Sequence, residues 1–229
     1  MKSLLALCGL DGVWFVAMTS VDICETFVSI QGESTYAGLG CVFIRLAGCN
    51  LRCGYCDTER ALEAAGNFVE IESLVSDVQA SRVPLVEITG GEPLLQAGFS
   101  ELAETLVQKS GKTVLVETNG SLDISLIPSA AVAIVDVKCP ESGAGGSFEL
   151  ENIDRLRKYD ELKFVLMGRD DYEWARGFVA EHGLVDKVRA VHFSPVAEKL
   201  DAAILGGWIL EDCLGVRLQI QLHRIAGME

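Results

Sequence analysis

Three cysteines, Cys49, Cys53 and Cys56, lie within one eight-residue segment in the arrangement CxxxCxxC. Thiolates are soft ligands that suit iron–sulfur clusters or zinc. A structural zinc site needs four ligands, and neither a fourth cysteine nor a histidine lies nearby in the sequence. Three thiolates instead match three irons of a cubane and leave the fourth iron open. The spacing therefore favours a [4Fe–4S] cluster, with a zinc site completed by a remote ligand as the alternative.

The other five cysteines are scattered along the chain. They are Cys8, Cys24, Cys41, Cys139 and Cys213. A secreted scaffold held by disulfides is usually much shorter than 229 residues and poorer in apolar side chains. Isolated cysteines in a chain of this kind behave mostly as small hydrophobic residues. We therefore expect these five to be buried packing residues.

Apolar runs alternate with helix-like stretches over most of the chain. The sequence predicts strands over residues 41–46, 85–89, 113–117, 132–137, 162–167 and 189–193, with a last extended run over 216–222. It predicts helices over residues 71–81, 100–109, 152–159, 171–182 and 198–205. This alternation implies parallel strands joined by right-handed crossovers, and near-continuous apolar strands imply burial on both faces. A barrel and a doubly wound sheet both satisfy the pattern.

Short polar motifs directly follow most of these predicted strands. After the cysteine loop they are Gly90-Gly91-Glu92, Glu117-Thr118-Asn119-Gly120, Lys138 and Ser194-Pro195. Taken singly, each is also compatible with a plain turn or, for Lys138, with a snorkelling side chain. In a barrel, however, the carboxyl ends of the strands converge on one mouth, where the active site is usually found. The sequence therefore predicts an α/β fold with a partial, incomplete parallel β/α barrel of about six strands.

The composition is that of a globular protein with a strong acidic excess. A formal net charge of -14 argues against a protein that follows nucleic-acid phosphates, because that role requires a basic face. No apolar run reaches the length of a membrane span. An apolar stretch near the amino end resembles a signal peptide only faintly, because Gly9, Asp11 and Gly12 interrupt it. We expect residues 1–17 to be an extension of unknown role, residues 18–229 to be a single domain, and the protein to be cytoplasmic.

The cysteine loop is similar to that of the radical S-adenosylmethionine (SAM) superfamily, which has this spacing with an aromatic residue, here Tyr55, before the last cysteine. The Gly90-Gly91-Glu92-Pro93 segment resembles the GGE motif of the same superfamily. The resemblance implies a radical SAM barrel in which the open iron chelates S-adenosylmethionine and the cluster transfers an electron to it. No side chain is assigned as catalytic, because the radical is generated on the cofactor. The cofactor-binding residues that the resemblance implies are Tyr55, Gly91, Glu92, Glu117, Asn119, Asp136, Val137, Lys138 and Ser194.

Further segments resemble one family in particular, the 7-carboxy-7-deazaguanine synthases. They are FVSIQGE (27–33), FIRLAGCNLRC (43–53), CDT (56–58), TGGEPLLQ (89–96), ETNG (117–120), residues 136–143, SPV (194–196) and LQIQLHRI (218–225). The resemblance runs from about residue 21 to residue 225. It implies a Mg²⁺ site at Thr58 and a substrate, 6-carboxy-5,6,7,8-tetrahydropterin. The substrate-binding residues that it implies are Ile30, Gln31, Gly32, Glu33, Arg45 and Thr89.

The chemistry of these residues agrees with a flat, anionic heterocycle. Gln31 and the backbone around it offer paired donors and acceptors for a pterin edge, with a plain turn amide as the alternative. Arg45 offers a fork for a carboxylate, and an arginine inside the apolar run VFIRLAG must point inward or be paired. Asp57 and Thr58 suit a magnesium site that keeps several waters, but apart from the resemblance a helix N-cap is the preferred interpretation of these two residues.

The resemblance also implies a reaction and partners. The reaction is a radical ring contraction of the pterin with loss of ammonia, in queuosine or deazapurine biosynthesis, with S-adenosylmethionine regenerated. The partners are an electron donor such as flavodoxin or ferredoxin and a second copy of the chain in a homodimer. An activase that forms a glycyl radical on a partner enzyme, or a non-catalytic iron–sulfur protein, is the alternative. One departure is Ser34, where the family opening is commonly QGEG, and a serine there restricts the backbone if φ is positive.

Overall fold

The computed structural model describes residues 20–228. The predicted extension, residues 1–17, lies outside this range. The strands are β1 (Ser20–Ile30), β2 (Gly40–Leu46), β3 (Phe68–Glu70), β4 (Leu85–Gly90), β5 (Thr113–Thr118), β6 (Val132–Lys138), β7 (Glu161–Leu166), β8 (Ala190–Pro195) and β9 (Arg217–Leu218). The helices are α1 (Ile71–Ala80), α2 (Phe99–Lys109), α3 (Asn152–Arg155), α4 (Arg169–Glu181), α5 (Leu184–Lys187), α6 (Ala202–Glu211) and α7 (Leu222–Ile225).

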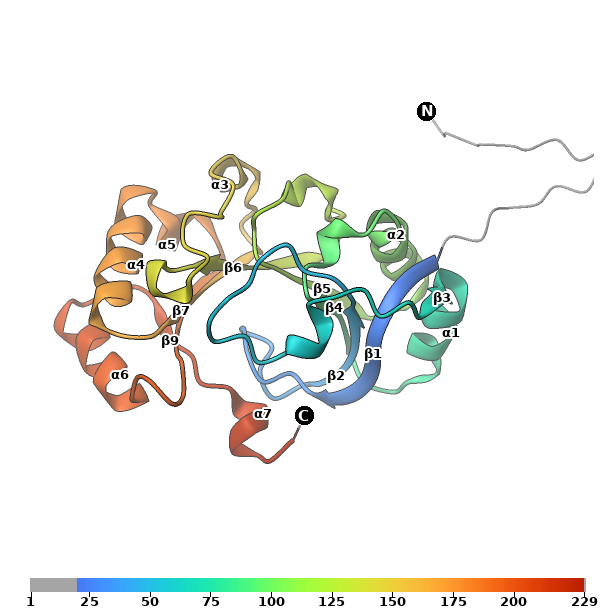
Figure 1. Cartoon of the computed structure of the whole chain (residues 1–229), viewed down its shortest axis with the longest axis horizontal. Coiled ribbons are helices and arrows are strands. Elements are labelled where there is room, and N and C mark those ends of the chain that lie inside the picture. The colour runs from blue at the N-terminus through green and yellow to red at the C-terminus, as the bar shows by residue number, and fades with distance from the viewer. Residues whose placement is uncertain (1–19, 229) are drawn as a thin grey trace, which may run out of the picture.

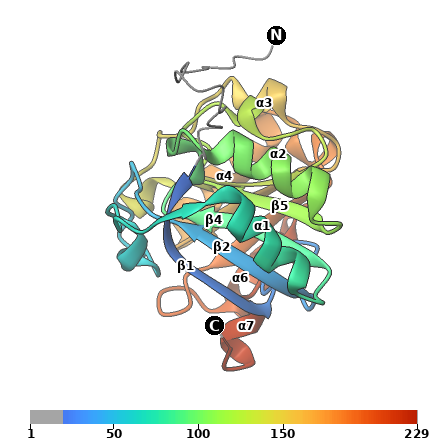
Figure 2. The same ribbon diagram turned by 90° about the vertical axis from the view of Figure 1, so that its right-hand side faces the viewer.

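Within the described residues, the nine strands form one sheet in the order β3-β1-β2-β4-β5-β6-β7-β8-β9. From β2 to β8 it contains six long parallel strands in chain order, which confirms the predicted partial barrel. The sequence did not reveal β1, which pairs antiparallel with both β2 and β3 at one edge. The strands curve around a centre and the larger helices lie outside them (Figure 1). Figure 2 shows α1 and α2 side by side over the sheet near β4 and β5.

Apolar side chains pack on both faces of this sheet. A large cluster fills the space between the strands and the outer helices, and includes Leu102 of α2 and Tyr172 of α4. A smaller cluster consists of Cys41, Phe43, Leu85, Leu115, Val132 and Ile134. Because side chains alternate along a strand, Glu87, Glu117 and Asp136 face the same side as the smaller cluster, two residues further along their strands. The inner face is therefore apolar at one end and charged near the carboxyl ends of the strands.

Three predicted elements were wrong in extent. The helix predicted over residues 152–159 is only the short α3, because Leu156 has an extended backbone. The helix predicted over 198–205 is instead α6, which begins later because Asp201 caps its first turn. The run predicted over 216–222 pairs with the sheet only at β9 and then turns into α7. None of the helices in residues 20–228 combines the length and hydropathy of a membrane span.

Candidate active site

A cavity of about 250 Å³ lies at the carboxyl ends of the parallel strands. Strands β2 and β4 to β8 contribute to its lining, as do the cysteine loop, the loop after β1 and the C-terminal segment. The predicted site residues that line it are Ile30, Gln31, Gly32, Glu33, Arg45, Cys49, Cys53, Tyr55, Cys56, Thr58, Thr89, Gly91, Glu117, Asn119, Asp136, Lys138 and Ser194. The fold thus brings residues from seven separate segments to one cavity, close in size to an ordinary small-molecule site.

The cysteine loop follows β2 and is held by backbone hydrogen bonds. The N–H of Cys49 donates to the carbonyl of Leu62 (3.0 Å), and that of Gly54 donates to the carbonyl of Ser142 (2.8 Å). Burial raises the pKa of the Cys49 and Cys53 thiols, so metal must displace their protons on binding. The loop therefore presents three thiols to the cavity from a fixed backbone.

The arrangement of the thiols suits a cluster. Within residues 20–228, no three His, Cys, Asp or Glu side chains surround one point in the way that ligands of a single ion do. A [4Fe–4S] cluster makes a different demand, because each thiolate binds its own iron. Three half-buried thiols lining one cavity meet that demand.

The glycine turn after β4 approaches the cysteine loop so closely that a side chain would not fit. A Cβ atom on Gly91 would lie 2.3 Å from the carbonyl oxygen of Gly48 and 2.5 Å from that of Ala61. The N–H of Glu92 donates to the same Gly48 oxygen (2.8 Å). Glycine is needed here because it is the residue without a Cβ. The turn consequently forms part of the wall next to the thiols.

Two of the predicted cofactor-binding residues do not line the cavity. Glu92 is fully buried, and its carboxylate accepts hydrogen bonds from the N–H groups of Leu94 (3.0 Å) and Asn119 (2.7 Å) and from the hydroxyl of Thr118 (2.8 Å). Burial raises the pKa of Glu92 to about 7 against the opposing effect of these bonds. Glu92 thus ties the glycine turn to the turn after β5. The side chain of Val137 packs in the large apolar cluster and is not available to a ligand in the cavity.

The comparisons with known proteins agree with this geometry. Residues 43–138 match the model of the Radical SAM superfamily. The chain is 45% identical to the 7-carboxy-7-deazaguanine synthase of Koribacter versatilis, with 89% of this chain and 96% of that protein covered. It is 40% identical to the synthase of Chlorobaculum tepidum, with 89% and 93% covered. The chain belongs to the 7-carboxy-7-deazaguanine synthase family.

The crystal structure of QueE from Escherichia coli shares the fold, with a TM-score of 0.74 and 24% identity over 89% of this chain and 95% of that one. As a member of the synthase family, the chain is a radical SAM enzyme that uses a [4Fe–4S] cluster and S-adenosyl-L-methionine. These relatives support the synthase prediction and give no support to an activase or to a non-catalytic iron–sulfur protein.

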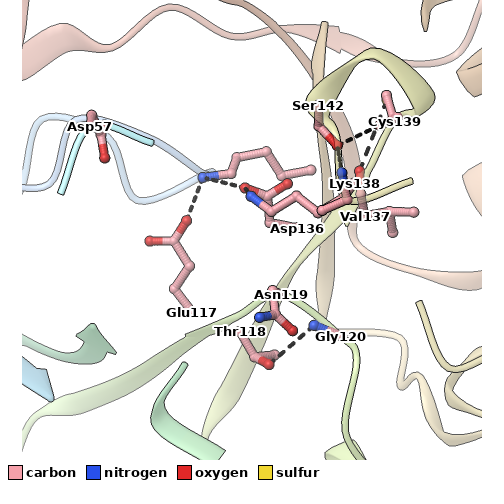
Figure 3. Close-up of polar contacts among 12 residues, drawn as sticks. Asp57, Glu117, Thr118, Asn119, Gly120, Asp136, Val137, Lys138, Cys139 and Ser142 are labelled. Atoms are coloured by element: carbon pink, nitrogen blue, oxygen red, sulfur yellow. Dashed lines mark hydrogen bonds and ion pairs between the residues drawn. The ribbon is translucent and has the colours of Figure 1, made fainter. Parts of the chain in front are cut away.

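Two buried polar atoms beside the thiols fit a bound cofactor. Within the described residues, the hydroxyl of Tyr55 and Oδ1 of Asp136 are buried without a hydrogen-bond partner, although both residues line the cavity. Lys138 lies over the Tyr55 ring at 5.5 Å and pairs with the other oxygen of Asp136 at 2.9 Å. Figure 3 shows Asp136, Lys138, Glu117 and Asn119 around this part of the site. Unpaired buried polar groups are costly, so a ligand that bonds them stabilises the site.

The side chain of Gln31 is engaged within the protein. Its Nε2 donates to Glu87, and its Oε1 accepts from the N–H of Glu33 (2.9 Å). Glu87 is buried on β4, and burial together with the nearby Glu117 and Glu33 raises its pKa well above the usual range. Glu87 was not predicted as a site residue, although a charged residue in the apolar run LVEITG is the same signal that revealed Arg45.

Arg45 is paired, as its apolar surroundings predicted. Its Nε donates to Glu25 at 2.7 Å, and its guanidinium lies 5.9 Å from the ring centre of Phe27. Phe27 stacks on Phe43 with ring centres 4.9 Å apart. Nη1 and Nη2 of Arg45 have no partner among the described residues, and Arg45 lines the cavity. A forked donor next to two stacked rings suits a flat ligand with a carboxylate.

The C-terminal segment closes the site next to the loop after β1. The side chains of Gln219 and Gln221 donate to Glu33 at 3.1 and 2.7 Å. The N–H of Leu222 donates to the Gly32 carbonyl (2.9 Å), and His223 lies directly against Gly32. This contact explains the small residue in the SIQGE segment. His223 was not singled out from the sequence as a site residue and appeared only within the LQIQLHRI segment, yet it lines the cavity with Gln221.

Ser34 has a positive φ, the conformation in which a serine is unfavourable where the family commonly has the glycine of QGEG. Its φ is 61°, in the left-handed region that favours glycine. Two hydrogen bonds compensate, since its N–H donates to Oε1 of Gln219 (2.7 Å) and its Oγ accepts from the N–H of Tyr36 (3.2 Å). The loop keeps its shape despite the serine.

Proposed function

We propose that this chain converts 6-carboxy-5,6,7,8-tetrahydropterin into 7-carboxy-7-deazaguanine with loss of ammonia, as a step of queuosine or deazapurine biosynthesis. The observation that carries the proposal is a single cavity with two chemically different walls. One wall presents the thiols of Cys49, Cys53 and Cys56, and the other presents the loop around Gln31 and the guanidinium of Arg45. A cofactor and an anionic heterocycle held on these walls would face one another.

On the first wall, the residues of this chain hold the cofactors. When bound, the reduced cluster and S-adenosyl-L-methionine supply the radical chemistry that starts the reaction. Cys49, Cys53 and Cys56 hold the cluster, and the glycine turn at Gly91 offers backbone groups to the amino acid moiety of the cofactor. The remaining polar groups of the cofactor are bound by Tyr55, Glu117, Asn119, Asp136, the Val137 backbone, Lys138 and Ser194. Glu92 supports the glycine turn by accepting a hydrogen bond from the N–H of Asn119.

On the second wall, the substrate meets backbone and charge. The Gln31 amide already makes hydrogen bonds with Glu87 and Glu33. The backbone groups of Ile30 and Gly32 are therefore the part of the loop that hydrogen-bonds the edge of the pterin. The Arg45 fork receives the carboxylate, and the Thr89 hydroxyl, which donates to Glu117 at 3.4 Å, sits between substrate and cofactor residues. Exclusion of water from the occupied site would favour a radical reaction, because it prevents side reactions.

Thr58 is the residue that we propose to bind Mg²⁺. It lines the cavity and precedes a single 3₁₀ turn, which its side chain does not cap. Its hydroxyl donates to Asp57 at 2.9 Å, and Asp57 pairs with Arg224 at 3.2 Å. One hydroxyl is a weak site by itself, so the substrate carboxylate must complete the magnesium shell.

We further propose a homodimer, a flavodoxin or ferredoxin as electron donor and a cytoplasmic location. Exposed apolar side chains, Val28 and Leu39 beside Leu222 and Ile225 of α7, offer an interface where α7 contacts β1. Three thiol ligands require a compartment that keeps cysteines reduced. Sedimentation of cluster-loaded protein tests the dimer.

The activity is tested by direct assay. Anaerobically reconstituted protein is incubated with dithionite, Mg²⁺, S-adenosyl-L-methionine and the carboxytetrahydropterin, and the product is sought by mass spectrometry. We expect 7-carboxy-7-deazaguanine from the wild type and none from Cys53→Ala. Reductive formation of 5′-deoxyadenosine without this product would refute the substrate and leave the radical chemistry in place.

A further inference from the structure

Lys163 lies at the centre of the charged side chains around the cavity. Its side chain is 7% exposed, and its Nζ lies 2.8 Å from Oε2 of Glu33 and 3.4 Å from Oδ2 of Asp136, and hydrogen-bonds Glu117. These carboxylates come from the loop after β1, from β6 and from β5. In Figure 3, Glu117 and Asp136 reach toward a common point from two neighbouring strands. One ammonium on β7 therefore connects three elements.

The charges around Lys163 do not have a simple structural purpose. Burial opposes the charge of Lys163, but Glu117, Glu33 and Asp136 raise its pKa well above the usual value. Lys163 in turn lowers the pKa of Glu33 against the effect of burial, so both stay ionised. Buried ion networks seldom stabilise a fold more than apolar packing does, and charged groups in a cleft mark functional sites. The position of this network beside the cavity points to the reaction.

The two carboxylates nearest to Lys163 belong to the two walls of the site. Glu33 lies in the loop assigned to the substrate, where Gln219 and Gln221 also hold it. Glu117 lies among the residues assigned to the cofactor. Hydrogen transfer between two bound molecules requires reacting atoms about 3–3.5 Å apart, and a shift of about 1 Å is costly. A group that fixes Glu33 relative to Glu117 therefore fixes substrate relative to cofactor.

We propose that Lys163 is a positioning residue whose ammonium fixes the substrate-side carboxylate of Glu33 relative to the cofactor-side carboxylate of Glu117. With the two molecules held in this way, each hydrogen removed from the substrate is returned before the cofactor fragment escapes. The proposal rests on the proposed function. It adds a residue that the motifs do not contain, and it predicts a defect in coupling in addition to a loss of rate.

The test compares Lys163→Met with Lys163→Arg in cluster-loaded protein. Two Kd values, for S-adenosyl-L-methionine and for the carboxytetrahydropterin, are measured anaerobically by equilibrium dialysis, and released 5′-deoxyadenosine is counted per molecule of deazapurine product. Lys163→Met loses one charge-assisted contact on each side, to Glu33 and to Glu117, so we expect both Kd values to rise about tenfold or more. We expect released 5′-deoxyadenosine per product to rise in parallel. Lys163→Arg keeps the charge but places it differently among the three carboxylates. Its Kd values should therefore stay within about threefold of the wild type, while released 5′-deoxyadenosine per product should still rise.

The matched control is Lys112→Met. Lys112 is half-buried and donates to the carbonyls of Ser81 and Val83, away from the cavity, so its loss should change neither Kd value nor the ratio. A folded, cluster-loaded Lys163→Met with wild-type Kd values and ratio would overturn the proposal. If Lys163→Met does not fold, Lys163→Arg decides. A guanidinium cannot reproduce the position of an ammonium among the three carboxylates, so a ratio equal to that of the wild type would overturn the proposal.

Failure of the proposed function would look different. Wild-type protein that binds S-adenosyl-L-methionine and forms no deazapurine would refute the substrate. The effect of Lys163→Met on the Kd of S-adenosyl-L-methionine would still be measurable in that protein, and a Kd that did not change would refute the role of Lys163 separately.

Discussion

Replacement of Gly32 by alanine should push the C-terminal segment away from the substrate side of the cavity. A Cβ atom at this position would lie 1.8 Å from Nδ1 of His223 and 2.8 Å from its Cγ. The imidazole must therefore move by about 1.6 Å to restore a contact of 3.4 Å. The N–H of the preceding Leu222 donates to the Gly32 carbonyl (2.9 Å), so the backbone next to His223 is held and the ring must rotate about its own side-chain bonds. Overpacking of a closed core costs about 1–3 kcal/mol. A ring that can rotate places this change near the lower end, at about 1 kcal/mol, which corresponds to a fall in kcat/KM of about 5-fold if it acts at the substrate site.

The assay is a double-mutant cycle on kcat/KM for the carboxytetrahydropterin. Gly32→Ala, His223→Ala and the double variant are compared with the wild type at equal cluster content. If the effect is steric, the double variant should match His223→Ala, because the added methyl then meets no ring. Gly177→Ala on α4, where a Cβ meets nothing within 4 Å, controls for the general effect of replacing a glycine. An equal loss from Gly32→Ala with and without His223 would refute the reasoning.

Three further outcomes follow from the site. Cys53→Ala should lose the visible absorption of the reconstituted cluster and keep the wild-type circular dichroism, since backbone bonds hold the loop; a retained absorption band would contradict the assignment. Ser34→Val should lower the unfolding free energy by about 1–3 kcal/mol, because a β-branched residue is strained at φ 61°, whereas Ser34→Gly should lower it far less; thermal denaturation of both variants distinguishes them. Glu92 has a pKa of about 7 in the folded protein against 4.5 ordinarily, so the folded state binds the extra proton and the unfolding free energy falls by about 3 kcal/mol as pH rises from 4.5 to 7. Glu92→Gln cannot titrate, so its stability deficit relative to wild type, measured by denaturant unfolding, should shrink over that pH range, and a constant deficit would contradict the assignment.

The sequence by itself determined the class of chemistry and the kind of fold. The cluster can be predicted from the spacing of Cys49, Cys53 and Cys56, because these three thiols lie at short intervals on one loop. The parallel sheet can be predicted from the apolar runs that alternate with helical stretches, because burial on both faces imposes a pattern on each strand separately. Arg45 was visible for the same reason, as a charge within an apolar run that had to be paired.

Only the tertiary structure decided which groups meet across the cavity. Lys163 and Glu87 stand on different strands, and nothing in either segment says that they face the same carboxylates; strand order and register place them there. The role of the C-terminal segment, where His223 packs on Gly32, likewise depends on contacts between residues about 190 positions apart in sequence. Local patterns specify the cluster ligands and the strands because these depend on residues close together in sequence. The charge balance of the site instead depends on the assembled partial barrel and is determined only when the chain folds.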